Sequence, residues 1–129
     1  MHQEVGKELD ALARQVVDAA FTVHKTLGPG LLESAYEVCL GIELNRRGID
    51  FESQLPLSII YEDTTVESAF RLDILVEDRL IVELKAVERL LPIHEAQLLT
   101  YLRLSQRRLG LLINFNTPLI KDGIKRLVL

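Results

Sequence analysis

The feature that most constrains this chain is a pair of strand patterns that each carry one carboxylate. Residues 66–76 and 80–86 are rich in apolar residues, and only three residues separate them, which predicts a β-hairpin with a tight turn. Counting outward from the middle of that turn places Asp73 directly opposite Glu83. The two carboxylates therefore share a face that is otherwise apolar, with Lys85 two residues beyond Glu83.

Two carboxylates in this position need a partner. Like charges directly opposite each other destabilise a sheet, and burying unpaired charge is costly. A divalent cation held between Asp73 and Glu83 would remove both penalties, and hard oxygen ligands suit Mg²⁺ or Mn²⁺. The alternative is a surface hairpin in which Asp73, Glu83 and Lys85 pair with one another in water. The apolar character of both hairpin faces favours central strands and hence the metal site.

The rest of the chain predicts one α/β domain that spans residues 1–129. The period of the apolar residues predicts helices over 8–27, 31–47 and 93–105, further strands over 51–59 and 109–115, and a possible edge strand over 124–129. Within the first strand of the hairpin, alternation predicts that Leu72, Ile74 and Val76 share the face away from Asp73. This order of elements is typical of an α+β fold with a mixed sheet flanked by helices.

The composition fits a single globular domain, because 48% of the 129 residues are hydrophobic and 26% are charged. No apolar run approaches the roughly 18 residues that a membrane span needs. The N-terminal segment also lacks the pattern of a signal peptide. The single cysteine, Cys39, cannot form an internal disulfide, which favours a reducing compartment. We therefore expect a cytoplasmic protein with no membrane attachment.

The charge is distributed unevenly along the chain. The net charge is −4, but residues 103–129 carry six basic and one acidic side chain, or +5, which leaves −9 for residues 1–102. A basic end on an acidic body suits an anionic ligand at one place. The candidates for holding phosphate groups there are Arg107, Arg108 and Lys125. The alternative is a basic surface that is only solvated.

Polar residues also interrupt the apolar faces of two predicted helices. His94, Gln97 and Tyr101 lie in the middle of the buried arc of the third helix, where they need partners. They either form hydrogen bonds within the core or belong to a site. Glu33 stands at the start of a row of apolar side chains on the second helix, with Tyr36 beside it. A glutamate there is either a helix-start charge favoured by the helix dipole or a ligand that points into a site.

Five segments, in order along the chain, resemble the GxxExxY proteins, a bacterial family placed in the PD-(D/E)xK nuclease superfamily. These segments are Gly30–Tyr36, Phe70–Asp73, Ile81–Val87, His94–Tyr101 and Gly110–Phe115. The resemblance covers roughly residues 8–128, which is essentially the whole chain. One departure is Leu72, which stands where the name-giving motif of the superfamily has a proline.

The resemblance implies a fold and a set of residue roles. The fold is a restriction-endonuclease-like core of helix, three strands, helix and strand over about residues 30–128, preceded by an extra helix over about 8–27. The roles are metal ligands at Glu33, Asp73 and Glu83, a motif lysine at Lys85, and catalytic side chains at Gln97 and Tyr101 in a Q-x-x-x-Y motif. We add Tyr36 and His94 as candidate substrate contacts.

We therefore expect a nuclease that depends on Mg²⁺, or on Mn²⁺, and hydrolyses phosphodiester bonds in DNA, with RNA as the second choice. Intact Asp73, Glu83 and Lys85 favour catalysis. The alternative is a non-catalytic nuclease-fold module that binds nucleic acid or a protein partner, which the small size and the acidic body favour. The first helix could form a homodimer surface, although we favour its use in covering one side of the sheet.

Overall fold

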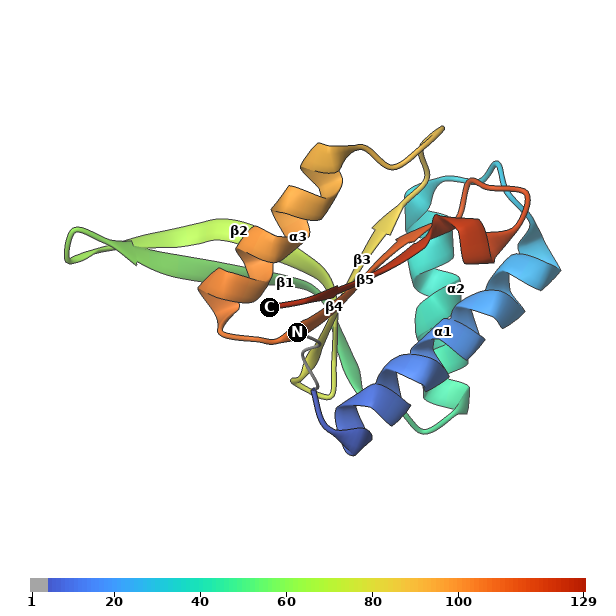
Figure 1. The fold of residues 1–129 in the computed structure, drawn as a ribbon, viewed down its shortest axis with the longest axis horizontal. Coiled ribbons are helices and arrows are strands. Elements are labelled where there is room, and N and C mark those ends of the chain that lie inside the picture. The colour runs from blue at the N-terminus through green and yellow to red at the C-terminus, as the bar shows by residue number, and fades with distance from the viewer. Residues whose placement is uncertain (1–4) are drawn as a thin grey trace.

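The computed structural model describes residues 5–129, in which three α-helices surround one twisted sheet (Figure 1). The helices are α1 (Lys7–Leu27), α2 (Glu33–Arg46) and α3 (Pro92–Ser105). The strands are β1 (Phe51–Tyr61), β2 (Thr64–Val76), β3 (Leu80–Lys85), β4 (Leu109–Asn114) and β5 (Ile124–Val128), and a short 3-10 helix, η1 (Ile120–Gly123), precedes β5. The predicted order of elements is confirmed, and the C-terminal tail does add an edge strand.

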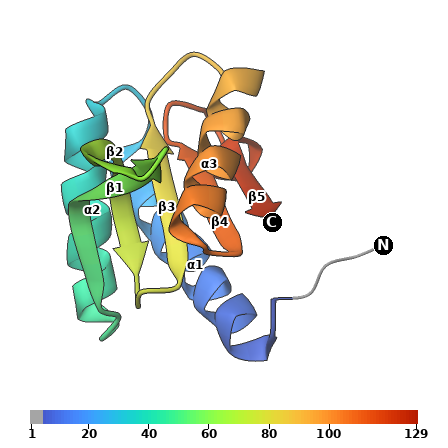
Figure 2. The same cartoon turned by 90° about the vertical axis from the view of Figure 1, so that its left-hand side faces the viewer.

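The five strands form one mixed sheet in the order β1-β2-β3-β4-β5. Neighbouring strands are antiparallel except β3 and β4, which are parallel. Helix α3 is the crossover between these two, because a tight turn cannot join parallel neighbours. Helices α1 and α2 cover one face of the sheet and α3 covers the other (Figure 2). The result is a three-layer α+β arrangement.

Each face of the sheet has its own apolar core. The larger core lies under α1 and α2 and contains the inward stripe of α1, which is formed by Leu9, Leu12, Ala13, Val16, Ala19, Ala20 and Val23. The smaller core lies under α3 and consists of Leu72, Leu75, Ile81, Leu98, Leu102 and Leu112. The buried stripe confirms that α1 covers the sheet. Within residues 5–129, no helix has the length and the apolar character that crossing a membrane requires.

Strand β2 changes its orientation at Asp73. Leu72 packs in the core under α3, whereas Ile74 and Val76 pack in the core under α1 and α2. The prediction that these three side chains share a face is therefore wrong. The physical reason is an interruption of the β1–β2 pairing beside Asp73, at Gln54, whose φ is 53°. The strand bends there, and the regular alternation of side chains is lost.

The outer part of β1 and β2 projects from the body as a hairpin arm, defined here as residues 57–70 (Figure 1). Glu62 and Asp63 form its turn with φ values of 50° and 64°, as a two-residue hairpin turn requires. Strand β1 therefore runs past its predicted end at Ile59. Most side chains of the arm are exposed, so the apolar cores do not extend to its tip.

Candidate metal centre

The carboxylates of Asp73 and Glu83 lie where strands β2 and β3 part. The pairs Ile74–Val82, Leu75–Ile81 and Val76–Leu80 have the predicted register, and the backbone ladder ends there. At the next position each carboxylate accepts a backbone N–H from the opposite strand. Glu83 Oε2 accepts the N–H of Asp73 at 2.9 Å, and Asp73 Oδ2 accepts the N–H of Leu84 at 2.9 Å. The two acidic side chains are thus held side by side by the strands themselves.

The surroundings of Glu83 disfavour its charged form. Its side chain is buried, with 3% of the residue exposed. Burial raises the pKa of Glu83 to about 8, and the negative charge of Asp73 adds to this, while the N–H of Asp73 and the ammonium of Lys85 oppose it. Without a cation, these surroundings therefore favour the protonated form of Glu83. A positive charge placed beside both carboxylates would favour ionised Glu83.

One oxygen of each carboxylate is left for a ligand. Asp73 Oδ1 and Glu83 Oε1 accept no hydrogen bond from the residues that the structure describes. Because no buried side-chain nitrogen or oxygen within residues 5–129 lacks a hydrogen-bond partner, these two oxygens are reachable by solvent. Two adjacent carboxylate oxygens of this kind are the donors that Mg²⁺ or Mn²⁺ prefers. Asp73 and Glu83 therefore fit a divalent cation.

Lys85 ends strand β3 on the same side as Glu83. Its ammonium donates to Gln97 Oε1 of α3 at 3.4 Å. The positive charge of Lys85 lowers the pKa values of Glu33 and Glu83 against the effect of burial. The lysine is thus near the carboxylates, and an amide from the facing helix holds its side chain.

Helix α3 directs Tyr101 to the same place. The ring of Tyr101 stacks on Phe70 with 4.9 Å between ring centroids. Partial burial raises the pKa of the Tyr101 hydroxyl, and the negative charges of Glu83 and Asp73 raise it further. Gln97 and Tyr101, four residues apart, therefore lie over the carboxylates as one helical face.

His94 has a local role at the start of α3. Its ring Nδ1 accepts the backbone N–H of Leu91 at 3.0 Å, and the backbone N–H of His94 donates to the Leu91 carbonyl at 2.9 Å. These two bonds satisfy polar groups that the end of a helix would leave unpaired. His94 therefore fixes where α3 begins, ahead of Gln97.

Glu33 interacts with the site at longer range. It is exposed at the first position of α2. Its pKa is raised first by partial burial and then by the charge of Asp73, whereas Lys85 lowers it. Across residues 5–129, however, no three His, Cys, Asp or Glu side chains are grouped closely enough to hold a metal ion. Glu33 therefore faces the site without completing a three-ligand cluster in this conformation.

Tyr36 does not offer a surface to a substrate, so that prediction is wrong. The residue is fully buried, and its ring stacks on Phe115 with 4.6 Å between ring centroids. Its hydroxyl donates to the Gly28 carbonyl at 2.6 Å and accepts the N–H of Leu31 at 3.1 Å. Tyr36 therefore ties down the loop before α2 and, through that loop, the position of Glu33.

The structure separates the three basic candidates. Arg107 binds Asp78, in the β2–β3 turn, at 2.6 Å. Arg107 comes just before β4, whose start pairs with the start of β3, and Lys85 lies at the opposite end of β3. Arg108 precedes the same end of β4. Lys125, by contrast, pairs with Leu112, which pairs with Glu83. Among the three, Lys125 alone is therefore level with the carboxylates, and the structure does not bring the three basic side chains to one place.

The side chain of Asn114 was not predicted to take part. It is buried at the end of β4, and its amide exchanges two hydrogen bonds with the backbone of Val87, at 3.0 and 2.9 Å. The N–H of Phe115 also donates to the carbonyl of Lys85 at 3.0 Å. These bonds fix the loop that leaves the site after Lys85. The available signal was a lone polar side chain in the apolar run 109–115.

Over residues 10–127 the chain matches a family model described as the PD-(D/E)XK nuclease superfamily. The three helices and the five-stranded mixed sheet agree with a restriction-endonuclease-like fold. No match was found among curated proteins or among solved structures.

Proposed function

The chain belongs to the PD-(D/E)XK nuclease superfamily, and on this basis we propose that it is a metal-dependent nuclease that cleaves DNA. The observation that carries the proposal is the pair of carboxylates, Asp73 and Glu83, each with one oxygen free of hydrogen bonds from the described residues. Nucleases of this superfamily generally use divalent metal ions. Within the superfamily, the segment Gly30–Tyr36 supports placement with the GxxExxY proteins.

Asp73 and Glu83 are the residues that would hold Mg²⁺ or Mn²⁺. When bound, such an ion supplies Lewis acidity at the scissile phosphate and charge against the negative transition state. The protein prepares for this by holding one oxygen of each carboxylate on a backbone N–H, so the other oxygen is oriented before any ligand arrives. Glu33, at the start of α2, adds negative charge to the same region.

Lys85, Gln97 and Tyr101 would act on the substrate. The ammonium of Lys85 orients the attacking water or donates to the charge that develops on the phosphate, a contribution typically worth about 10²-fold or more in rate. Gln97 keeps that ammonium in place through its Oε1. The hydroxyl of Tyr101 stays protonated, because burial and two carboxylates raise its pKa, and it can therefore donate to a phosphate oxygen.

A second candidate function is a nuclease-fold module that binds nucleic acid or a protein without cleaving. One observation favours it: no three-ligand metal cluster is preformed among residues 5–129. The two functions differ in what happens to a bound strand, so one assay separates them.

The test incubates the purified chain with labelled single- and double-stranded DNA and RNA in Mg²⁺, Mn²⁺ or EDTA. We expect DNA products with a metal ion and none with EDTA. Asp73→Ala and Lys85→Ala should abolish the products, whereas the control Glu8→Gln, an exposed carboxylate on α1, should not. Cleavage that survives Asp73→Ala contradicts this site. Binding without cleavage of all four substrates supports the module instead.

A further inference from the structure

The tip of the hairpin arm is both apolar and acidic. Ile60 and Tyr61 are 77% and 68% exposed, and Val66 beside them is also exposed. Residues 57–70 carry Glu62, Asp63 and Glu67 and contain no lysine or arginine. None of these three carboxylates forms an ion pair with a residue that the structure describes. A surface with these properties suits an apolar partner with a basic rim.

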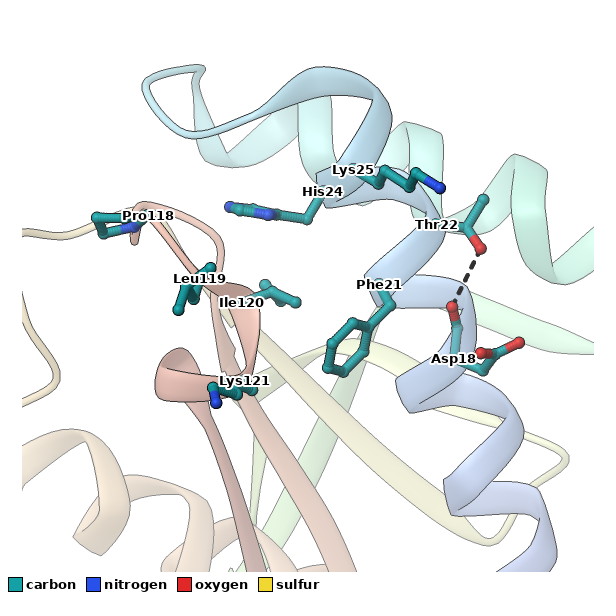
Figure 3. Close-up of a pocket in the computed structure, with 9 residues that line it drawn as sticks. All are labelled: Asp18, Phe21, Thr22, His24, Lys25, Pro118, Leu119, Ile120 and Lys121. Carbon is teal, nitrogen blue, oxygen red and sulfur yellow. Dashed lines mark hydrogen bonds between the residues drawn. The ribbon is translucent and has the colours of Figure 1, made fainter.

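A groove with complementary properties runs along α1, here called the α1 groove. It consists of two adjoining cavities of about 440 and 530 Å³ that share Asp18 and Phe21. In the first cavity Phe21 points from α1 toward the segment that carries Leu119 and Lys121 (Figure 3). Apolar side chains from α1, β4, β5, η1 and the two residues before η1 make up most of the lining.

The rim of the α1 groove is basic. Four cationic side chains line it, Arg14, Lys25, Lys121 and Arg126, against one carboxylate, Asp18. That carboxylate already binds Arg47, the residue just after α2, at 2.8 Å. Arg14 and Arg126 share Asp10, but Lys25 and Lys121 pair with no acidic group in the part of the chain that the structure describes. The rim can therefore accept carboxylates from a partner.

We propose that the hairpin arm of one copy of this chain docks in the α1 groove of a second copy. Ile60 and Tyr61 would contact Phe21 and Leu119, and the acidic turn would face Lys121 on the basic rim. The occupant is a second copy because the chain itself carries both complementary surfaces. Nucleic acid does not fit the arm, since three unpaired carboxylates would repel its phosphates.

The arm cannot reach the groove of its own chain. The arm projects from one end of the molecule, while η1 and the C-terminal part of α1 lie at the opposite end (Figure 1). Two copies placed side by side in opposite directions bring each arm to the groove of the other. This reciprocal exchange closes a two-fold dimer, whereas a single contact per pair would continue into an open assembly.

The first test is the mass of the full chain by light scattering after gel filtration. We expect twice the monomer mass of 14.6 kDa. An arm variant, Ile60→Lys with Glu62→Lys, and a groove variant, Leu119→Glu with Lys121→Glu, should each be monomeric. All four positions are exposed, so the fold should survive, and circular dichroism checks this. A matched control, Val38→Lys on the exposed side of α2, should remain dimeric.

The decisive test mixes the two variants. In the mixed pair, the native acidic arm meets a native basic groove, and the lysine-bearing arm meets the glutamate-bearing groove. We therefore expect the mixture of two monomeric variants to form a dimer. A mixture that stays monomeric overturns the proposal, as does a monomeric or open-ended wild-type chain, or an arm variant that still dimerises.

Discussion

Glu83 accepts the backbone N–H of Asp73 at 2.9 Å, so a side chain takes the place of the backbone carbonyl that would continue the β2–β3 ladder. Asp73 does the same for Leu84 of the other strand. The strands can part at this point without leaving these N–H groups unpaired. The same exchange brings two carboxylates together in a partly buried place. The stability of the site therefore depends on how its negative charge is compensated.

Replacing Asp73 with Asn should stabilise the protein when no metal ion is present. The change removes one of two adjacent charges, while the amide oxygen can still accept the N–H of Leu84. At about pH 9, where Glu83 is ionised, we expect a gain of up to about 1 kcal/mol. Urea unfolding in EDTA measures it. A less stable variant under these conditions would count against repulsion between the two side chains.

The stability of the metal-free protein should depend on pH through Glu83. Its pKa rises from 4.5 in the unfolded chain to about 8 in the fold, so the folded state binds more protons between these values. The contribution of protonated Glu83 to the free energy of unfolding is complete below pH 4.5, decreases as the pH rises, and is lost above about 8. Glu83→Gln should lack this component. Unfolding curves at several pH values test this, and a pH-independent difference between the two proteins would refute it.

Tyr36→Phe should destabilise the fold without touching the carboxylates. The variant leaves the Gly28 carbonyl and the Leu31 N–H without their partner in a part-buried place. Groups of this kind typically cost about 1–3 kcal/mol when left unsatisfied. Thermal unfolding provides the measurement, with Tyr61→Phe on the exposed arm as the matched control. Equal stability of Tyr36→Phe and wild type would mean that the loop before α2 does not need this hydroxyl.

The salt dependence of DNA binding should identify Lys125 as a phosphate contact. Each phosphate neutralised contributes about −0.9 to the slope of log affinity against log salt for duplex DNA. Lys125→Ala should therefore make the slope shallower by about that amount, whereas Arg107→Ala, whose guanidinium is held by Asp78, should leave it unchanged. Fluorescence anisotropy on an Asp73→Ala background measures both. A slope that becomes shallower in Arg107→Ala and stays unchanged in Lys125→Ala would place the phosphate contacts at the other end of the sheet.

Local patterns were enough to predict the core of the site. The three-residue turn and the period of two determine the register of β2 and β3, and therefore the approach of Asp73 to Glu83. The four-residue spacing of Gln97 and Tyr101 likewise predicts one helical face. These relationships depend on a few consecutive residues, which is why sequence alone predicts them.

The errors came from contacts between distant parts of the chain. Tyr36 is buried because it stacks on Phe115, and Arg107 is held by Asp78, and no local period reports either contact. The bend at Asp73 depends in the same way on the neighbouring strand β1. Polar residues at helical spacing identify a face, but tertiary packing decides whether that face meets a ligand or the core.

The account depends on a divalent cation binding between Asp73 and Glu83, and a melting experiment tests this most directly. The melting temperature would be measured with saturating Mg²⁺ or Mn²⁺ and with EDTA, for wild type and for Asp73→Asn. An ion at 100 times its dissociation constant stabilises the fold by about 2.7 kcal/mol, so wild type should melt clearly higher with metal and the variant should not respond. Equal melting temperatures of the wild-type protein in metal and in EDTA would contradict the account.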